Sequence, residues 1–119
     1  MLTTRPARFL LVTAGIAGAL GVAAAARASH MGNDNLGIAA NFLLLHAPML
    51  IGLSLLATSR IAIAAGAVLA VGLALFAGDL AMRAFTGSAL FPMAAPLGGG
   101  GLILGWLLVV ATGIWGRRA

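Results

Sequence analysis

The stretch "LGIAANFLLLHAPMLIGLSLLA", residues Leu36–Ala57, runs for 22 residues without an aspartate, glutamate, lysine or arginine. An α-helix rises 1.5 Å per residue, so this stretch would form a helix about 33 Å long. The hydrocarbon core of a bilayer is about 30 Å thick, so one such helix can cross it. The stretch therefore predicts a transmembrane helix that carries a histidine, His46, near its middle.

Three more apolar runs have the same character and lie at Phe9–Ala26, Ile61–Met82 and Leu97–Trp115. They are rich in Ala, Leu and Gly and show no alternation of period two, while lipid accepts only helices or closed barrels. We therefore predict an all-α fold, a four-transmembrane-helix bundle in one integral membrane domain of residues 1–119. The candidate spans are 9–26, 36–57, 61–82 and 97–115.

The composition of the 119 residues agrees with this environment. Hydrophobic residues make up 62% and charged residues 8%, against about 45–50% and about 25% in soluble domains. There is no cysteine, so disulfides and thiolate chemistry are excluded. The net charge of +5 comes from arginines outside the apolar runs, which makes them topology signals and argues against a nucleic-acid partner. The expected partner is the lipid bilayer.

Two short connections order the spans: a polar loop expected over Arg27–Asn35 and a tight turn expected over Thr58–Arg60. A cytoplasmic N-terminus places two arginines outside, Arg27 and Arg83, and five inside: Arg5, Arg8, Arg60, Arg117 and Arg118. This bias predicts that both termini are cytoplasmic. The N-terminal segment also resembles a secretory signal with a small-residue cleavage site, but the length of its apolar run favours an uncleaved span.

Small residues indicate how the helices pack. Gly101 and Gly105 are four residues apart, beside Gly98, and the first span has similar pairs at Ala14 with Gly18 and Ala17 with Gly21. Such spacing lets helix backbones approach closely. We expect Gly101 or Gly105 to face a neighbouring helix of the same chain. A phosphate-binding interpretation of the four consecutive glycines fails because no Lys and Ser/Thr follow them.

The few polar side chains form a candidate polar site. In the predicted orientation Asn41 lies about 8 Å and His46 about 15 Å below the outer boundary of the second span. Asp79 lies near the outer end of the third span, where Arg83, four residues later, can neutralise it. His30 is expected in the outer loop.

His46 has two interpretations. Pro48 leaves the Leu44 carbonyl without a helical donor, and a neutral imidazole could donate to a backbone carbonyl or pair with another span, which is a structural role. Ionisable residues inside membranes are also functional candidates. His30 and His46 differ in depth by about 15 Å or more, and no cysteine, glutamate or metal-ligand spacing accompanies them, so we expect no metal, cofactor or catalytic residue.

Four motifs appear in order: "GVAAAARASH" (21–30), "NFLLLHAPMLIGLSLL" (41–56), "LFAGDLAM" (75–82) and "APLGGGGLILGW" (95–106). Their order resembles the small four-helix bacterial inner-membrane family called domain of unknown function 423, which is related to transmembrane protein 256. The matching positions are His30, His46, Phe76, Gly78, Pro96, Gly98, Gly99, Gly105 and Trp106. Members of that family usually have serine at the position of Asp79, an aromatic residue or glutamine near Asn41, and threonine at the position of Ala95.

The leading hypothesis for function is a non-enzymatic accessory or assembly protein of the bacterial inner membrane, whose glycine-lined faces dock on a second copy or on a larger membrane complex. The alternative is a small oligomeric channel or transporter with a polar path through His46, Asn41 and Asp79. A membrane enzyme is not expected, because no paired catalytic groups are present.

Overall fold

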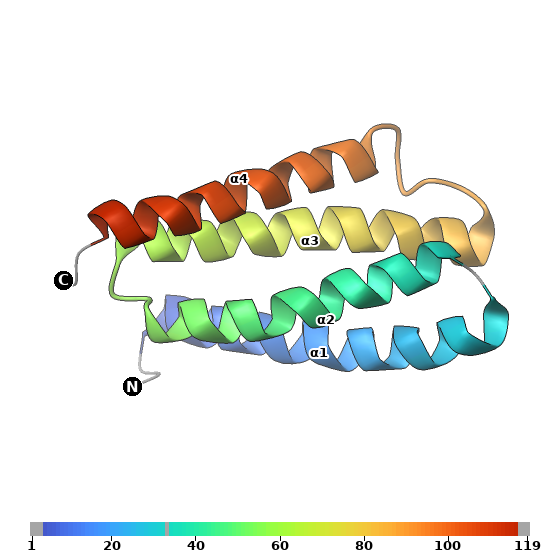
Figure 1. Cartoon of the computed structure of the whole chain (residues 1–119), viewed down its shortest axis with the longest axis horizontal. Coiled ribbons are helices and arrows are strands. Elements are labelled where there is room, and N and C mark those ends of the chain that lie inside the picture. Colours follow the sequence, from blue (N-terminus) through green and yellow to red (C-terminus); the bar gives the residue numbers. More distant parts are fainter. Residues whose placement is uncertain (1–3, 33, 117–119) are drawn as a thin grey trace.

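A computed structural model of the chain describes residues 4–32 and 34–116, and this part of the chain contains four α-helices and no β-strand. They are α1 (Arg5–Met31), α2 (Asp34–Leu55), α3 (Arg60–Thr86) and α4 (Ala94–Trp115). The helices run side by side in alternating directions along a molecule of 46 × 26 × 20 Å (Figure 1). All four are long and apolar enough to cross a membrane, which confirms the predicted all-α, four-span fold.

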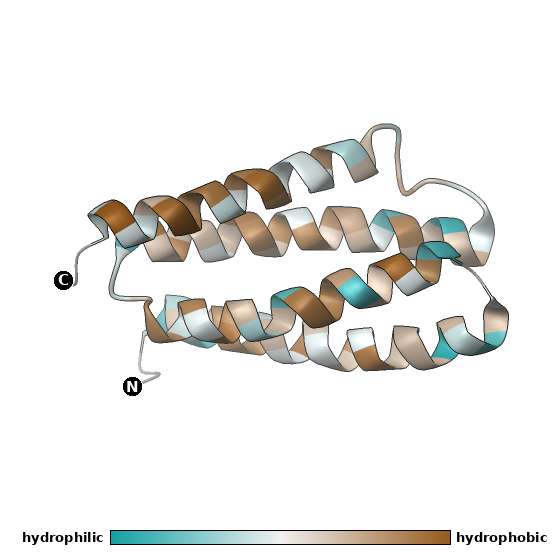
Figure 2. Ribbon diagram, in the orientation of Figure 1, coloured by the Kyte–Doolittle hydropathy of each residue, from teal (hydrophilic) through white to brown (hydrophobic). Residues whose placement is uncertain are grey.

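Hydrophobic residues follow the helices along most of their length, and hydrophilic colours gather toward the end of the molecule where α1 meets α2 (Figure 2). α1 begins and α4 ends at the opposite end (Figure 1). The arginines Arg117 and Arg118, on which the predicted orientation partly rests, lie outside the described residues.

The expected polar loop over Arg27–Asn35 is wrong at both ends, because α1 continues to Met31 and α2 already begins at Asp34. Polar side chains at the surface of a membrane can be solvated while the backbone keeps its helical hydrogen bonds, so they do not end a helix by themselves. α1 ends at Gly32, which takes the left-handed conformation at φ 63° and donates its N–H to the carbonyl of Ala28. Glycine adopts this conformation without steric cost.

The other helix ends depend on local hydrogen bonds. α2 stops at Leu55, before the predicted end of its span, and Ser59 then caps α3 by accepting the N–H of Ala62 at 3.3 Å. Ser59 is therefore the helix-start residue of the tight turn. At the far end of α3, Gly87 has φ 76° and donates to the carbonyl of Arg83.

The four helices pack in chain order, as α1 on α2, α2 on α3 and α3 on α4. α1 also touches α3 over a short length, whereas no described Cα of α4 lies within 8 Å of a Cα of α1 or α2. The core consists of alanines and leucines, among which Ala39, Leu50, Ala62, Ala65 and Leu69 are completely buried. α4 is consequently held by one neighbouring backbone only.

Glycines set the distance between α3 and α4. A Cβ added to Gly98 would lie 2.5 Å from the backbone nitrogen of Phe76, and one added to Gly72 would lie 2.8 Å from the nitrogen of Leu102. Real side chains do not approach so closely, so the two backbones can touch only because both positions lack a Cβ. Gly101 and Gly105 lie on the same face of α4, against Gly72 and Leu69. The three glycines expected to pack therefore contact α3.

Candidate functional site

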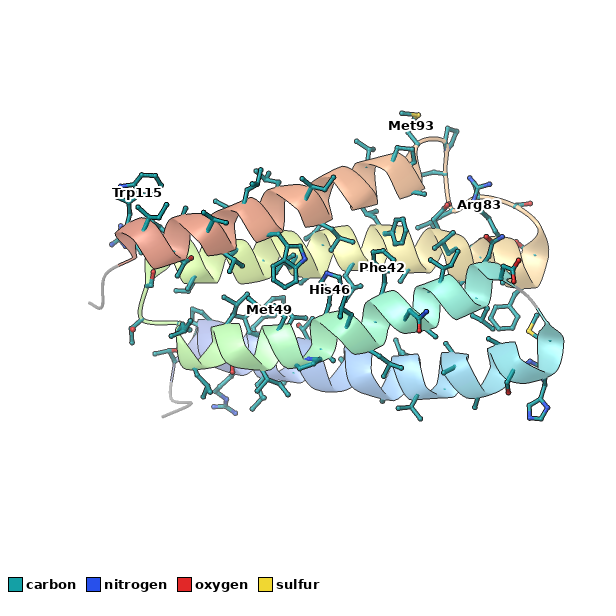
Figure 3. The ribbon with its side chains drawn as sticks, in the orientation of Figure 1. Phe42, His46, Met49, Arg83, Met93 and Trp115 are labelled. Atoms are coloured by element: carbon teal, nitrogen blue, oxygen red, sulfur yellow. The ribbon has the colours of Figure 1, made fainter. Side chains whose placement is uncertain are left out.

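His46 lies inside the molecule, about 18 Å along α2 from its start at Asp34 and about 14 Å from its end. Only 2% of the residue is exposed. In Figure 3 its ring extends from α2 toward α4 and lies beside Phe42 and Met49. The imidazole is therefore near mid-depth of the spans and faces the bundle interior, as expected from its position in the second apolar run.

Both ring nitrogens of His46 have hydrogen-bond partners. Nδ1 lies 2.8 Å from the carbonyl oxygen of Phe42, and Nε2 lies 3.1 Å from Nε1 of Trp106. A backbone carbonyl can only accept and an indole N–H can only donate, so Nδ1 must carry a hydrogen and Nε2 must not. This arrangement specifies the neutral imidazole with the proton on Nδ1, because the charged ring would turn Nε2 into a second donor facing a donor.

His46 bonds to a backbone carbonyl and to a side chain of another span, as the structural interpretation predicts, but the carbonyl is not that of Leu44, which Pro48 leaves free. Pro48 lies inside α2 and has no backbone N–H to donate to the carbonyl of Leu44. Nδ1 of His46 nevertheless binds the carbonyl of Phe42, which is one helical turn before His46. The bond is therefore local and follows the i, i−4 geometry of the helix. Pro48 does not supply the acceptor of His46.

Trp106 reaches His46 because of how α4 sits on α3. Gly105 precedes it, and a Cβ added there would lie 2.5 Å from Cδ2 of Leu69 on α3. The close packing at Gly105 directs the neighbouring indole sideways toward α2, although the backbones of α2 and α4 stay apart. The Trp106–His46 hydrogen bond is therefore a side-chain bridge between two helices that have no Cα atoms within 8 Å of each other among the described residues.

Aromatic rings continue this bridge toward α3. The rings of Phe42 and His46 stack with centroids 5.9 Å apart, and those of His46 and Trp106 lie 5.7 Å apart at 58°. Phe42 also contacts Phe76 of α3, with centroids 4.5 Å apart. Offset and tilted aromatic pairs of this kind add stabilisation beyond the area they bury. The cluster of Phe42, His46, Phe76 and Trp106, here called the aromatic cluster, joins three helices at mid-depth.

Asp79 has a different role, at the end of the molecule that holds the α3–α4 connection. Its carboxylate is completely buried, and Oδ2 accepts a hydrogen bond from Nε of Arg83 at 2.8 Å. Oδ1 accepts the backbone N–H of Leu90, also at 2.8 Å. One buried carboxylate therefore neutralises an arginine and tethers the connection to α3, which is a structural use of the charge.

The remaining candidates of the polar site lie elsewhere. Asn41 is exposed on α2, beside Ala25 and Ser29 of α1, and so faces away from the aromatic cluster. His30 is exposed in the last turn of α1 and not in a loop. Across the described residues, no three His, Cys, Asp or Glu side chains lie close enough together to hold a metal ion. The structure does not bring His46, Asn41 and Asp79 together.

Sequence reasoning did not identify Trp106 or Leu90 as partners. Trp106 lies about as far along α4 as His46 lies along α2, and an indole N–H in an apolar span needs an acceptor, so a comparison of depths could have paired them. The Asp79–Leu90 bond joins residues 11 apart through an irregular connection. No spacing in the sequence signals such a bond.

Comparison with known proteins decides the family. The model of a protein family described as "Protein of unknown function (DUF423)" matches residues 10–99. The chain belongs to the DUF423 family. The DUF423 match includes His46, Phe42, Phe76 and Asp79 but ends before Trp106, so the partner of His46 lies outside the matched range. No curated protein and no solved structure matches the chain.

Proposed function

We propose that this DUF423 protein is a non-enzymatic accessory or assembly protein, which associates with another membrane helix through the outward face of α4. The observation that supports this best is that the backbone of α4 approaches that of α3 alone, while the residues of α4 that point away from α3 and α2 are exposed in the described chain. A span with one backbone neighbour offers most of its surface to a further helix.

The outward face of α4 has the spacing of a helix-packing surface. Its exposed residues repeat every three or four positions and therefore lie on one side of the helix: Gly100, Ile103, Leu107, Val110 and Ile114. We call this set the α4 stripe. It lies roughly opposite to the glycines that pack on α3, and a Cβ added to Gly100 would meet no atom within 4 Å. Small and branched apolar residues at this spacing suit close packing between membrane helices.

This proposal moves the docking surface away from the glycine-lined face. Gly98 and Gly105 are buried against α3, so they serve packing within the chain and offer no room to a partner. The aromatic cluster supports the same function indirectly, because the Trp106–His46 bond braces α4 from the side of α2. A braced helix presents its outer stripe in one orientation.

A channel or transporter has less support. Its path would need His46, Asn41 and Asp79 along one interior route, yet Asn41 is exposed on α2 and both oxygens of Asp79 already accept hydrogen bonds. Both nitrogens of His46 are also occupied. The polar groups that a path would use are engaged in holding the fold.

The proposal also places the protein in the bacterial inner membrane, with both termini in the cytoplasm. The orientation rests on the unequal distribution of arginines, with Arg27 and Arg83 at one end and Arg5, Arg8 and Arg60 at the other among the described residues. The positive-inside rule assigns the end with more arginines to the cytoplasm.

Site-specific crosslinking tests the role of the α4 stripe. A photo-reactive residue replaces Leu107, or Ile16 as a matched control, which is also exposed at the middle of a span. The chain has no cysteine, so Leu107→Cys and Ile16→Cys give a parallel disulfide test for a second copy. We expect a discrete crosslinked product from position 107 and none from position 16. Equal products, or none at either position, would contradict the proposal.

A His46→Leu variant, measured by crosslinking and by transport, distinguishes the assembly protein from the channel or transporter. His46→Leu removes every polar atom of the imidazole and with it the brace on α4, but it leaves the backbone contact between α3 and α4 and the residues of the α4 stripe in place. An assembly protein should keep the crosslink from position 107 in this variant, whereas a proton or solute path through His46 would lose transport. Transport into vesicles by the native chain that His46→Leu abolishes would favour the channel.

A further inference from the structure

An apolar groove of about 540 Å³ lies between α1, α2 and α3, away from the aromatic cluster and from the α4 stripe. It exists because α1 packs mainly on α2 and meets α3 over a short length only. The side chains between α1 and α3 are also small, and they include Ala24, Ala74, Ala77 and Ala81. We call it the α1–α3 groove.

The groove runs along the membrane normal. Its α3 wall extends from Leu73 to Phe85, a length of about 18 Å. Leu73 is near the middle of α3, and Phe85 is next to the last residue of the helix. The groove therefore begins at the membrane surface and ends near mid-depth.

One charged residue lines the groove. Arg27 lies at its mouth, one helical turn before the end of α1 at Met31, and its side chain is exposed. No ion pair joins it to any described residue, in contrast to Arg83, which pairs with Asp79. The groove thus combines a hydrocarbon wall in its depth with one free guanidinium group at the surface.

The length of the groove suits a single acyl chain. Its α3 wall is about 18 Å long and runs from the membrane surface to near mid-depth, which is the depth that an acyl chain of one leaflet occupies. Its wall is apolar, and hydrocarbon chains pack on such a wall with carbons about 4 Å apart. One extended acyl chain can therefore lie along the groove.

We propose that the α1–α3 groove binds one acyl chain of an anionic phospholipid, whose phosphate contacts Arg27. A guanidinium group presents several N–H donors in a plane and matches the oxygens of a phosphate. The apolar wall takes the chain, and the cation selects a lipid with a net negative headgroup. The site is independent of the crosslinking surface proposed for α4, so either proposal can fail alone.

Native mass spectrometry of the whole chain in mild detergent tests the headgroup contact. The probes are phosphatidylglycerol and phosphatidylcholine with identical acyl chains. We expect one phosphatidylglycerol bound in preference to phosphatidylcholine, and Arg27→Gln should reduce its occupancy about fivefold, the change that corresponds to about 1 kcal/mol per arginine near a charged lipid surface. Arg60→Gln removes the same charge at the other end of the molecule and should have no effect.

A second pair of variants tests the groove itself. Ala74→Leu fills the groove from an exposed position on α3, and Ala64→Leu adds the same atoms on α3 outside it. Ala74→Leu should abolish the preference for phosphatidylglycerol, and Ala64→Leu should not. If Ala74→Leu unfolds at a lower temperature than the native chain, Ala81→Leu serves as a second variant that fills the groove. All variants are first checked for thermal unfolding in lipid-free detergent.

Four results would overturn the proposal. The first is equal binding of the two lipids by the native chain, and the second is an equal loss in Arg27→Gln and Arg60→Gln. The third is retained binding in both groove-filling variants, which would reduce the effect to surface charge. A dimer that Ala74→Leu disrupts whatever the lipid charge would show a second copy in the groove and would equally exclude a lipid.

Discussion

The hydrogen bond between Trp106 and His46 offers the most direct test of how this fold is held. Trp106→Phe keeps an aromatic ring but removes the only N–H that reaches Nε2 of His46 among the described residues, and this nitrogen is then buried without a donor there. A buried polar atom without a partner costs about 1–3 kcal/mol of stability. Within membranes, side-chain hydrogen bonds between helices average about 0.6 kcal/mol and reach about 1.7 kcal/mol. We therefore expect Trp106→Phe to lower the free energy of unfolding by about 1–2 kcal/mol.

A double-mutant cycle isolates the bond from the rest of the side chains. His46→Leu leaves the indole N–H without its acceptor, and because Trp106 lies at mid-depth its exposed part faces lipid, which offers no other acceptor. The double variant His46→Leu with Trp106→Phe has two apolar partners and no orphaned polar atom. It should be more stable than the sum of the single effects predicts, by about 0.6–1.7 kcal/mol.

The assay is equilibrium unfolding in mixed micelles, followed by far-ultraviolet circular dichroism, because the variant lacks one of the two tryptophans. Trp115→Phe is the matched control, since Trp115 lies on the same helix and is 66% exposed. It should change stability by less than about 0.5 kcal/mol. Single effects that add within about 0.5 kcal/mol would refute the bridge between α2 and α4.

Three further predictions concern packing, the α3–α4 connection and topology. Gly98→Ala should destabilise the protein by about 1–3 kcal/mol in the same unfolding assay, because the new Cβ would lie 2.5 Å from a backbone nitrogen of α3. Gly100→Ala adds the same atom in open space and should be neutral or slightly stabilising. Equal effects of the two variants would mean that α3 and α4 can separate freely. Asp79→Ala should make the amide of Leu90 exchange with deuterium about tenfold faster or more, because that N–H loses its acceptor; unchanged exchange would show that the connection is held by other contacts. A reporter that is active only in the cytoplasm should be active when fused after Ala119, and activity of a reporter specific for the outside would reverse the proposed orientation.

Much of the fold could be predicted from the sequence because the bilayer restricts the choices. In lipid, each span must satisfy its backbone hydrogen bonds within itself, so length and hydropathy predict where helices lie. The ends were harder, because they depend on single residues. Gly32 ends α1 through a left-handed conformation, and Ser59 starts α3 through a side-chain hydrogen bond. Polarity alone placed the end of α1 too early.

The candidate site could be predicted in part. The depth of His46 implied burial and a partner inside the bundle, and the spacing of Asp79 and Arg83 implied their ion pair. The partners Trp106 and Leu90 could not be read from spacing, because each bond depends on the position of another element. Asn41 was grouped with His46 from depth alone, but rotation about the helix axis places it on the outer side of α2.

The sequence by itself therefore determined that the protein spans a membrane with four helices, because hydropathy and length act along the chain and need no knowledge of neighbours. Tertiary structure decided which faces meet. Gly72 and Gly98 bring α3 and α4 into backbone contact, and this contact directs Trp106 onto His46 across a gap that the backbones of α2 and α4 do not close. The direction in which a side chain points depends on helix rotation and packing distance, and both arise only when the helices are assembled.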